Sequence, residues 1–396
     1  MFYKRVRQLF AIAVIGLFSL SSTCASAAWF LPLPQLPGAS HAGDAFAVSA
    51  DGTTIAGTSH DGRSNSGATN QAVRWTVDGV IAPLNAGDSS IAQGVSSDGS
   101  IIVGYQNVSA DQIAFRWSAA TGAVNIGDLL GGQTSGRAND VSADGSVAVG
   151  LSFSSEGAQA FRWTAPTGTV GLGDLPGGTF GSEAFGISAD GSTIVGASVS
   201  SNGIEAFHWT NQTGMIALGD LPGGGFFSEA YDTSNDGSVI VGRSIANNTL
   251  FPYRAFRWSP EVGLSPLPDI SGIGPPAIAR AVSADGNVIV GGAYAGDSAI
   301  AFAWDPFHGS RSIAELLLAQ GAQVDGFELG SAHGVSADGL TIAGVGLPRG
   351  GSIFQPWVAR LDPGTFIPEP GSMALLISSA LSLTLFVWYR HPGDMQ

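Results

Sequence analysis

The chain has 396 residues, of which 44% are hydrophobic, only 12% are charged and 57 are glycine. This composition is typical of many turns and closely packed strands with few helices. In an average protein charged residues make up ~25% of the chain and glycine ~7%. Residues 28–367 hold 12 Arg, no Lys and 29 acidic residues, a balance of −17, which argues against nucleic acid as a partner. The single cysteine, Cys24, lies in a predicted signal sequence, so we expect no disulfide and no thiolate site in the mature chain.

Residues 1–27 have the three parts of a secretory signal peptide. Its positive start, apolar stretch and cleavage residues are, in order, Lys4, Arg5 and Arg7; residues 9–20; and Ala25, Ala27 and Ala28. A lipoprotein signal that uses Cys24 is the alternative, but Ser-Ser-Thr before it fits a lipid-attachment sequence poorly. We therefore expect an exported protein that begins at Ala28.

One phrase returns seven times along the chain, and residues 185–196 are a clear copy of it. Ser stands two residues before an Asp, Gly follows the Asp, and a second Gly comes five residues later. The seven Asp residues are Asp51, Asp98, Asp144, Asp190, Asp236, Asp285 and Asp338. A Trp follows each copy along the chain: Trp75, Trp117, Trp163, Trp209, Trp258, Trp304 and Trp357. Self-similarity with steps of 46 to 53 residues predicts a repeat architecture.

The repeat unit at 183–224 reads as four short strands. Two strands flank the Ser-Ala-Asp-Gly turn, a third carries Phe207 and Trp209 on one face, and a fourth ends at Pro-Gly-Gly. Four strands in ~46 residues is the size of a propeller blade. The last unit stops after three strands, whereas 29–38 resembles the end of a unit. We predict an all-β, seven-bladed β-propeller over residues 28–362, closed by an N-terminal strand that leaves no exposed sheet edge.

Two segments depart from the repeat. Residues 311–322 lengthen the last step and predict a short helix at 313–319, which either covers the closing blade or forms a rim lid. Residues 363–372 are a linker that holds Pro368, Glu369 and Pro370, and 373–396 contain 17 uncharged residues followed by Arg390. That length and the basic flank predict a transmembrane helix with a cytoplasmic end.

The tail resembles a PEP-CTERM sorting signal, on the order Pro-Glu-Pro, apolar stretch and Arg390. The resemblance implies that an exosortase-type transpeptidase of exopolysaccharide-producing Gram-negative bacteria reads the tail, after transient anchoring in the inner membrane. This chain has one Arg and one His where the family has an Arg cluster.

The body resembles the HAF-type extracellular repeat family. The resemblance rests on Ala-Phe-Arg-Trp at 160–163, Leu-Gly-Asp-Leu-Pro-Gly-Gly at 172–178, the Ser-Ala-Asp-Gly turn, and a closing repeat from Phe327. It implies an extracellular location and a repeat fold, and it brings no chemistry with it.

Each repeated residue has a structural and a functional interpretation. The turn Asp residues could bind calcium, but each turn offers one Asp and one Ser, whereas calcium needs several oxygens from one loop. The Trp residues could stack on sugars, but their regular spacing favours packing between blades. Arg74, Arg116, Arg162 and Arg257 each precede a Trp, where they could line a glycan surface; we expect them to pair with acids instead. The six His residues show no metal-ligand spacing, so we predict no metal and no cofactor.

These observations predict a non-enzymatic surface or matrix protein that binds exopolysaccharide or another envelope partner. Its variable rim loops, at 58–68, 247–253 and 273–278, would carry the site on a repeated scaffold. The alternative is a polysaccharide hydrolase or lyase with acidic residues at the mouth of the propeller channel. An inert spacer is the third interpretation.

Overall fold

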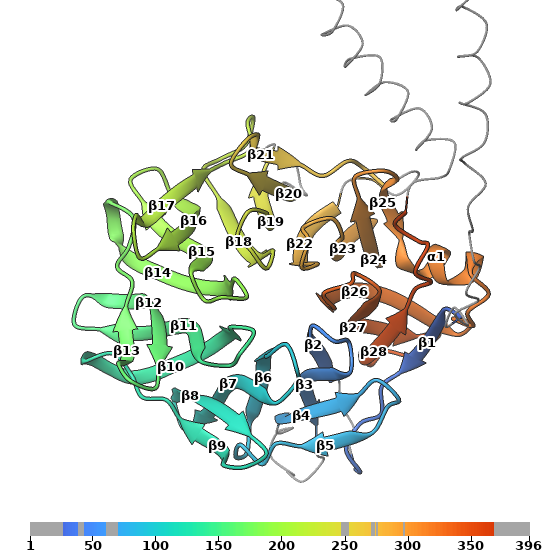
Figure 1. The fold of residues 1–396 in the computed structure, drawn as a ribbon, viewed down its shortest axis with the longest axis horizontal. Helices are drawn as coiled ribbons and strands as arrows, with labels where there is room; N and C mark the ends of the chain where they lie inside the picture. The colour runs from blue at the N-terminus through green and yellow to red at the C-terminus, as the bar shows by residue number, and fades with distance from the viewer. Residues whose placement is uncertain are drawn as a thin grey trace, which may run out of the picture.

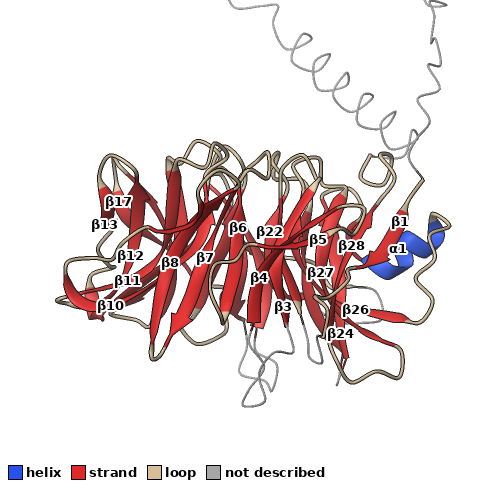
Figure 2. Cartoon of the chain, turned by 90° about the horizontal axis from the view of Figure 1, so that it is seen from below, coloured by secondary structure: helices blue, strands red, loops and turns tan. Residues whose placement is uncertain are grey.

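The structure, a computed structural model, describes residues 27–38, 43–60, 70–246, 253–270, 274, 276–295 and 298–367. These residues form seven four-stranded antiparallel sheets around a central axis, so the predicted seven-bladed β-propeller is confirmed (Figure 1). Seen from the side, the strands form a disc with turns and loops on both faces (Figure 2).

The blades follow one another along the chain, with the innermost strand first. Blade 1 is β2 (Asp44–Val48), β3 (Thr54–His60), β4 (Asn70–Thr76) and β5 (Ile81–Pro83), and blade 2 is β6 (Ser90–Val95), β7 (Ile101–Val108), β8 (Asp111–Ser118) and β9 (Gly122–Asn125). Blade 3 is β10 (Gly131–Val141), β11 (Val147–Ser154), β12 (Gly157–Thr164) and β13 (Gly168–Gly171), and blade 4 is β14 (Gly177–Ile187), β15 (Thr193–Ser200), β16 (Ile204–Thr210) and β17 (Gly214–Gly219). Blade 5 is β18 (Ser228–Thr233), β19 (Ile240–Ile245), β20 (Tyr253–Ser259) and β21 (Gly263–Pro266), and blade 6 is β22 (Pro276–Val282), β23 (Ile289–Ala295), β24 (Ser298–Asp305) and β25 (Gly309–Ser312). Blade 7 is β26 (Phe327–Val335), β27 (Thr341–Pro348), β28 (Gln355–Arg360) and β1 (Trp29–Pro32).

The N-terminal strand closes the ring, as the phase of the repeat predicts. β1 pairs antiparallel with β28, with Trp29 opposite Arg360 and Pro32 opposite Trp357. Figure 1 shows the first strand, in blue, beside the last, in red. The outer edge of blade 7 is therefore occupied by the start of the propeller, which links the two ends of the fold.

The repeated turn is held by its own side chains. Ser188 Oγ donates to Asp190 Oδ1 at 2.8 Å and accepts from the N–H of Thr193 at 2.9 Å. Asp190 Oδ1 also accepts from the N–H of Ser192 at 2.9 Å, and Gly191 has a φ of +72°. The other six turns repeat the Ser–Asp and Asp–backbone bonds. Each turn Asp thus uses one carboxylate oxygen to accept hydrogen bonds within its own turn.

The repeated Trp residues lie in the hydrophobic clusters between blades. Trp75 is fully buried in a cluster with Ala343 and Val358 of blade 7, and Trp117 joins Ala56 of blade 1. The remaining five lie in the corresponding clusters: Trp163, Trp209, Trp258, Trp304 and Trp357. The indole of each blade packs on the preceding blade and so contributes to every interface around the ring.

Two of the four Arg residues that precede a repeated Trp make contacts other than the acid pairs that we expected. The Arg74 guanidinium lies over the Trp117 ring at 5.1 Å, and Arg116 Nε donates to the Gly145 carbonyl at 3.0 Å. Both contacts reach the next blade, because the Arg side chain lies on the opposite face of its strand from the Trp. Arg74 and Arg116 therefore join neighbouring blades.

The predicted short helix is α1 (Ile313–Ala319), which covers the closing blade. Its Ile313 and Leu317 are fully buried in one cluster with Trp357 and Leu361. Ser312 caps its first turn by accepting from the N–H of Glu315.

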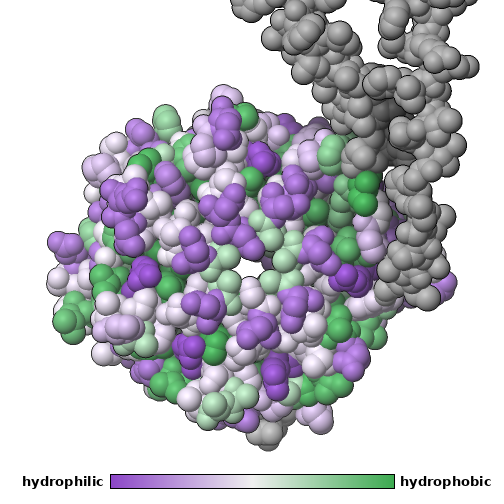
Figure 3. Space-filling model, viewed as in Figure 1, coloured by the Kyte–Doolittle hydropathy of each residue, from purple (hydrophilic) through white to green (hydrophobic). Residues whose placement is uncertain are grey.

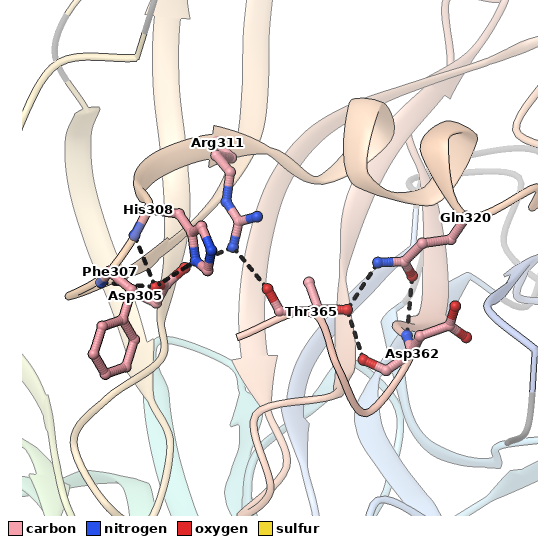
Figure 4. A network of polar contacts seen from close by, with 7 residues as sticks. All are labelled: Asp305, Phe307, His308, Arg311, Gln320, Asp362 and Thr365. Carbon is pink, nitrogen blue, oxygen red and sulfur yellow. Dashed lines mark hydrogen bonds and ion pairs between the residues drawn. The ribbon is translucent and has the colours of Figure 1, made fainter. Parts of the chain in front are cut away.

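The chain that follows β28 is tied to this corner of the fold. Arg311 Nη2 contacts Asp305 Oδ2 at 2.6 Å and donates to the Thr365 carbonyl, and Gln320 Nε2 donates to Thr365 Oγ1 at 2.8 Å (Figure 4). The N–H of Asp362 donates to Gln320 Oε1 at 2.9 Å. The described chain therefore ends against the segment that carries α1.

The predicted processing segments lie almost wholly outside the described residues. Ala25, the sorting residues Pro368, Glu369, Pro370 and Arg390, and the predicted transmembrane segment are among these. Ala27 and Ala28 are described, and Ala28 is buried against blade 7. Within the described ranges, no helix has both the length and the apolar character needed to cross a bilayer.

Candidate functional site: the central channel

The inner strands of all seven blades line a central channel with a cavity of about 530 Å³. Figure 3 shows a narrow opening at the centre of one face of the disc. Neither the turn Asp residues nor the repeated Trp residues line this cavity. Most of the rim loops that we expected to carry a site lie outside the described residues, so the channel is the candidate site of the described part.

A ring of backbone hydrogen bonds holds the end of the channel beside the repeated turns. In each of the seven blade junctions, one N–H of a turn donates to a carbonyl of a neighbouring turn, at 3.0 to 3.2 Å. The residues before the turn Asp are small or uncharged here: Ala50, Ser97, Ala143, Ala189, Asn235, Ala284 and Ala337. A mouth of this kind counts against catalytic acids at this end of the channel.

Four residues before each turn Asp, the inner strands of neighbouring blades approach one another closely, and we call this ring of residues the waist. The seven waist residues are Ala47, Gly94, Asp140, Gly186, Asp232, Ala281 and Gly334. A Cβ on Gly186 would lie 3.0 Å from the Asp232 Cα, and a Cβ on Gly94 would lie 2.8 Å from the Asp140 Cα. The strands approach so closely that glycine is required where one blade faces the backbone of the next.

The two waist Asp residues bridge neighbouring blades. Asp140 Oδ1 accepts from the N–H of Val141 at 2.8 Å, and its Oδ2 accepts from the N–H of Ile187 in blade 4 at 3.1 Å. Asp232 repeats the pattern with Thr233 at 2.7 Å and with Val282 of blade 6 at 2.9 Å.

Burial in the narrow channel sets the protonation of this pair. It raises the pKa of Asp140 to about 8, with a further contribution from the Asp232 charge, and it raises the pKa of Asp232 to about 7. In both residues burial outweighs the backbone hydrogen bonds, which favour the charged carboxylate.

A β-bulge next to the waist turns one extra side chain of each blade into the channel. The pairing register shifts between residues 45 and 47 of β2, and at the equivalent place in the other six inner strands. The bulge residues are Phe46, Gln93, Asn139, Phe185, Tyr231, Arg280 and His333, and all seven line the cavity. A bulge places consecutive side chains on one side of a strand, and here it builds a ring of seven residues of six types, with Phe in two blades.

Aromatic rings provide apolar surface in this bulge ring. Phe46 and His333 stack with centroids 5.8 Å apart and planes 9° apart, and Phe185 contacts Tyr231 at 5.4 Å. Burial, together with the nearby Arg280 charge, lowers the pKa of His333 to about 3, so its imidazole is neutral at physiological pH.

The Glu residues beside the bulge ring are engaged with Arg side chains. Arg137 binds Glu183 of the next blade through two bonds of 2.8 and 2.7 Å, and Asn139 Nδ2 donates to the same carboxylate at 2.8 Å. Arg243 binds Glu229 at 2.7 Å, and the Tyr231 hydroxyl also donates to Glu229. With Asp140 and Asp232 held by backbone, these carboxylates are committed to structural bonds.

Arg280 and Asp44 are the charged residues of the channel region that lack such bonds in the described part of the chain. Arg280 makes no ion pair or hydrogen bond there, and its buried Nε has no acceptor. Burial lowers its pKa, while the hydroxyls of Tyr231 and Tyr294 and the Asp44 carboxylate act in the opposite direction. Burial raises the pKa of Asp44, an effect that Arg280 opposes.

The bulge ring does not follow from the repeated residues of the sequence. The sequence signal for it is the position five residues before each turn Asp, where six residue types occur in seven copies although the position lies within the repeated phrase. Simple strand alternation has no place for an extra inward-facing residue, and so it does not predict the channel residues.

Within the described ranges, no three His, Cys, Asp or Glu residues cluster as metal ligands would.

Comparison with known structures supports the fold. The chain is similar to the β-propeller domain of the Trilobed protease from Pyrococcus furiosus, with 10% identity, a TM-score of 0.52, and coverage of 87% of this chain and 98% of that one. It is also similar to an oligogalacturonate lyase, with 12% identity, a TM-score of 0.50 and coverage of 86% and 99%. For TolB from Acinetobacter baumannii the identity is 13%, the TM-score 0.47 and the coverage 65% of this chain and 62% of that one.

The fold defines this protein as a seven-bladed β-propeller with four-stranded antiparallel blades. The Pyrococcus domain is described as having an open velcro topology, whereas β1 and β28 pair here. No protein-family model matches the chain, and no curated protein matches it either.

Proposed function

We propose that this protein is an exported cell-surface or extracellular-matrix propeller that binds polysaccharide in its central channel without cleaving it. The observation that carries the proposal is the bulge ring, where seven side chains of six types line one cavity on an otherwise repeated scaffold. Aromatic rings and polar groups on a rigid frame are suited to bind sugars, since their C–H faces need apolar surface and their hydroxyls need hydrogen bonds.

The state of the carboxylates favours binding over hydrolysis. A glycoside hydrolase needs two carboxyl groups free to act as acid and as base or nucleophile. Glu183 and Glu229 are held by Arg residues, and Asp140 and Asp232 by backbone N–H groups of two blades. The environment of Asp44 favours the alternative function, a hydrolase or lyase. Its carboxyl group has a raised pKa and no hydrogen bond among the described residues, and both properties suit a proton donor.

One experiment distinguishes binding from cleavage. Full-length protein in detergent is mixed with the exopolysaccharide of a producing strain, and co-sedimentation is measured together with the release of reducing or unsaturated ends. We expect sedimentation without new ends. New ends would establish the enzyme instead, and the absence of both would contradict polysaccharide as the ligand.

A matched pair of variants locates the site. Phe185→Ala removes a ring from the channel, whereas Phe226→Ala removes a ring that is 62% exposed and does not line the cavity. We expect the first variant to sediment less with the polysaccharide and the second to behave as the wild type.

Export and sorting are a separate part of the proposal. They are supported by the signal peptide pattern and by the Pro368-Glu369-Pro370 tail, which an exosortase-type transpeptidase would process. Replacing the three residues with Ala should leave an intact tail on membrane-bound protein in a strain that has the transpeptidase. Pro363→Ala, at an exposed position just upstream, is the control, and mass spectrometry of the C-terminus is the measurement.

A further inference from the structure

We infer that Arg280 is an anion-binding position in the channel and that the group it takes is the carboxylate of an acidic sugar, so that the bound polysaccharide contains uronate. This inference rests on the proposed binding of polysaccharide. It names the class of sugar and the residue that selects it.

The charges around the channel single out Arg280. Arg137 and Arg243 each contact a Glu at 2.7 Å. Arg280 has no acid within ion-pair distance among the described residues, and Asp44, on blade 1, interacts with it only through its field. The planar N–H donors of a guanidinium match a carboxylate in two parallel hydrogen bonds. The Arg280 guanidinium lies in a cavity without such an acceptor in the described part of the chain, so an anionic ligand would supply the missing partner.

The position of Arg280 directs it towards a ligand. It is the bulge residue of β22, and it lines the cavity between the bulge residues of blades 5 and 7, Tyr231 and His333. The neutral imidazole of His333 offers no competing charge, and its stacking partner Phe46 lies on the next blade. Arg280 thus lies beside apolar ring faces. This arrangement suits a sugar acid, which has a charged group on one edge and C–H groups on its faces.

The surroundings favour a singly charged anion. The balance of −17 over residues 28–367 opposes the entry of multiply charged groups such as phosphate esters. The cavity of about 530 Å³ is in the ~300–1,000 Å³ range of small-molecule sites, so it admits a short stretch or an end of a glycan. One carboxylate on a largely neutral sugar body satisfies both conditions.

The test compares two glycans that differ only in charge. The probes are a hexasaccharide with a single uronate residue, called the oligouronate here, and the same hexasaccharide after reduction of its carboxyl group to an alcohol. Binding to the full-length protein in detergent is measured by calorimetry. We expect the wild type to bind the oligouronate at least tenfold more tightly. Arg280→Gln should bind both probes with equal affinity, and Arg280→Lys, which keeps the charge but not the planar donors, should retain part of the preference.

Controls separate this role from a structural one. Arg257→Gln changes an Arg that does not line the cavity and should bind as the wild type does. Arg280→Gln should unfold at the same temperature as the wild type or a higher one, since Arg280 has no partner to lose among the described residues. A marked loss of thermal stability would show a structural role and overturn the inference.

The remaining outcomes are equally decisive. Equal binding of both probes by the wild type would overturn the uronate inference and leave the proposed polysaccharide binding intact. Failure to bind either probe would also overturn it, and the sedimentation experiment would then decide the proposed function by itself. Stronger displacement of the oligouronate by inorganic phosphate than by glucuronate would assign the position to phosphate and contradict a sugar acid.

Discussion

The two waist carboxylates should make the folded protein less stable as the pH rises from 7 to 9. Burial raises the pKa of Asp140 to about 8 and that of Asp232 to about 7, whereas both would titrate near 3.8 in the unfolded chain. The folded state therefore holds protons that the unfolded state has lost, and such a difference favours folding at low pH. This contribution is complete below pH ~4 and is lost as the pH passes through the two folded-state values.

The size of the effect follows from the two pKa values. One pKa unit corresponds to about 1.4 kcal/mol, so between pH 7 and 9 the titration of Asp140 costs about 1.4 kcal/mol and that of Asp232 about 0.4 kcal/mol. Together the two titrations should lower the free energy of unfolding by about 1 to 2 kcal/mol between pH 7 and 9. His333 contributes little here, because it is neutral in the folded state and nearly neutral in the unfolded state above pH 7.

The assay is urea unfolding followed by tryptophan fluorescence at pH 7, 8 and 9. The wild-type midpoint should fall across this range, and the double variant Asp140→Asn, Asp232→Asn should have a nearly constant midpoint. Asp190→Asn is the control, because hydrogen bonds from Ser192 and Ser188 hold the pKa of this turn carboxyl below its ordinary value and it does not titrate in this range. A wild-type midpoint that is equal at pH 7 and 9, or an unchanged fall in the double variant, would refute the reasoning.

Three further predictions concern the scaffold and are tested by urea midpoints. Ser188→Ala should cost about 1–3 kcal/mol, because a buried backbone N–H loses its acceptor, whereas the exposed Ser192→Ala should stay within about 0.5 kcal/mol. Gly186→Val should destabilise the ring by at least ~1–3 kcal/mol, since its Cβ would meet the next blade at 2.8 Å; an unchanged midpoint would show that the waist can widen. Leu317→Ala should cost about 2–5 kcal/mol and speed proteolysis after β28, and Leu318→Ala, 52% exposed, should do neither.

The number of blades and their closure were predictable because both depend on local rules that every copy obeys. A Ser, an Asp and a Gly at fixed spacing close one turn by their own hydrogen bonds, so the turn can be recognised without knowledge of the rest of the fold. The unit that stops at Arg360 and the fragment that begins at Trp29 can only complete each other, and they do so in the pairing of β1 with β28. The helix at 313–319 was predictable because it interrupts this regular pattern and therefore stands out as an insertion.

The channel was not predictable in the same way, because it depends on contacts between blades. Nothing local to Asp140 shows that its carboxylate reaches the N–H of Ile187, 47 residues further along. The bulge likewise places Arg280 in the cavity, where strict alternation would have turned it or its neighbour away. Residues that repeat reveal the scaffold, and residues that fail to repeat within a repeated phrase are the ones to examine for a site.

The geometry of closure restricts where this propeller can place a function. The turn end of the channel is bonded backbone to backbone, and the waist accepts Gly, Ala or an Asp that bridges two blades. The bulge position is a place in every inner strand where a large side chain can face the cavity without separating the blades. Five of the seven bulge residues carry polar groups, yet Arg280 alone among them is a cation. A site assembled one residue per blade in this way spreads its groups around a ring, as the proposed binding of a ligand along the channel would need.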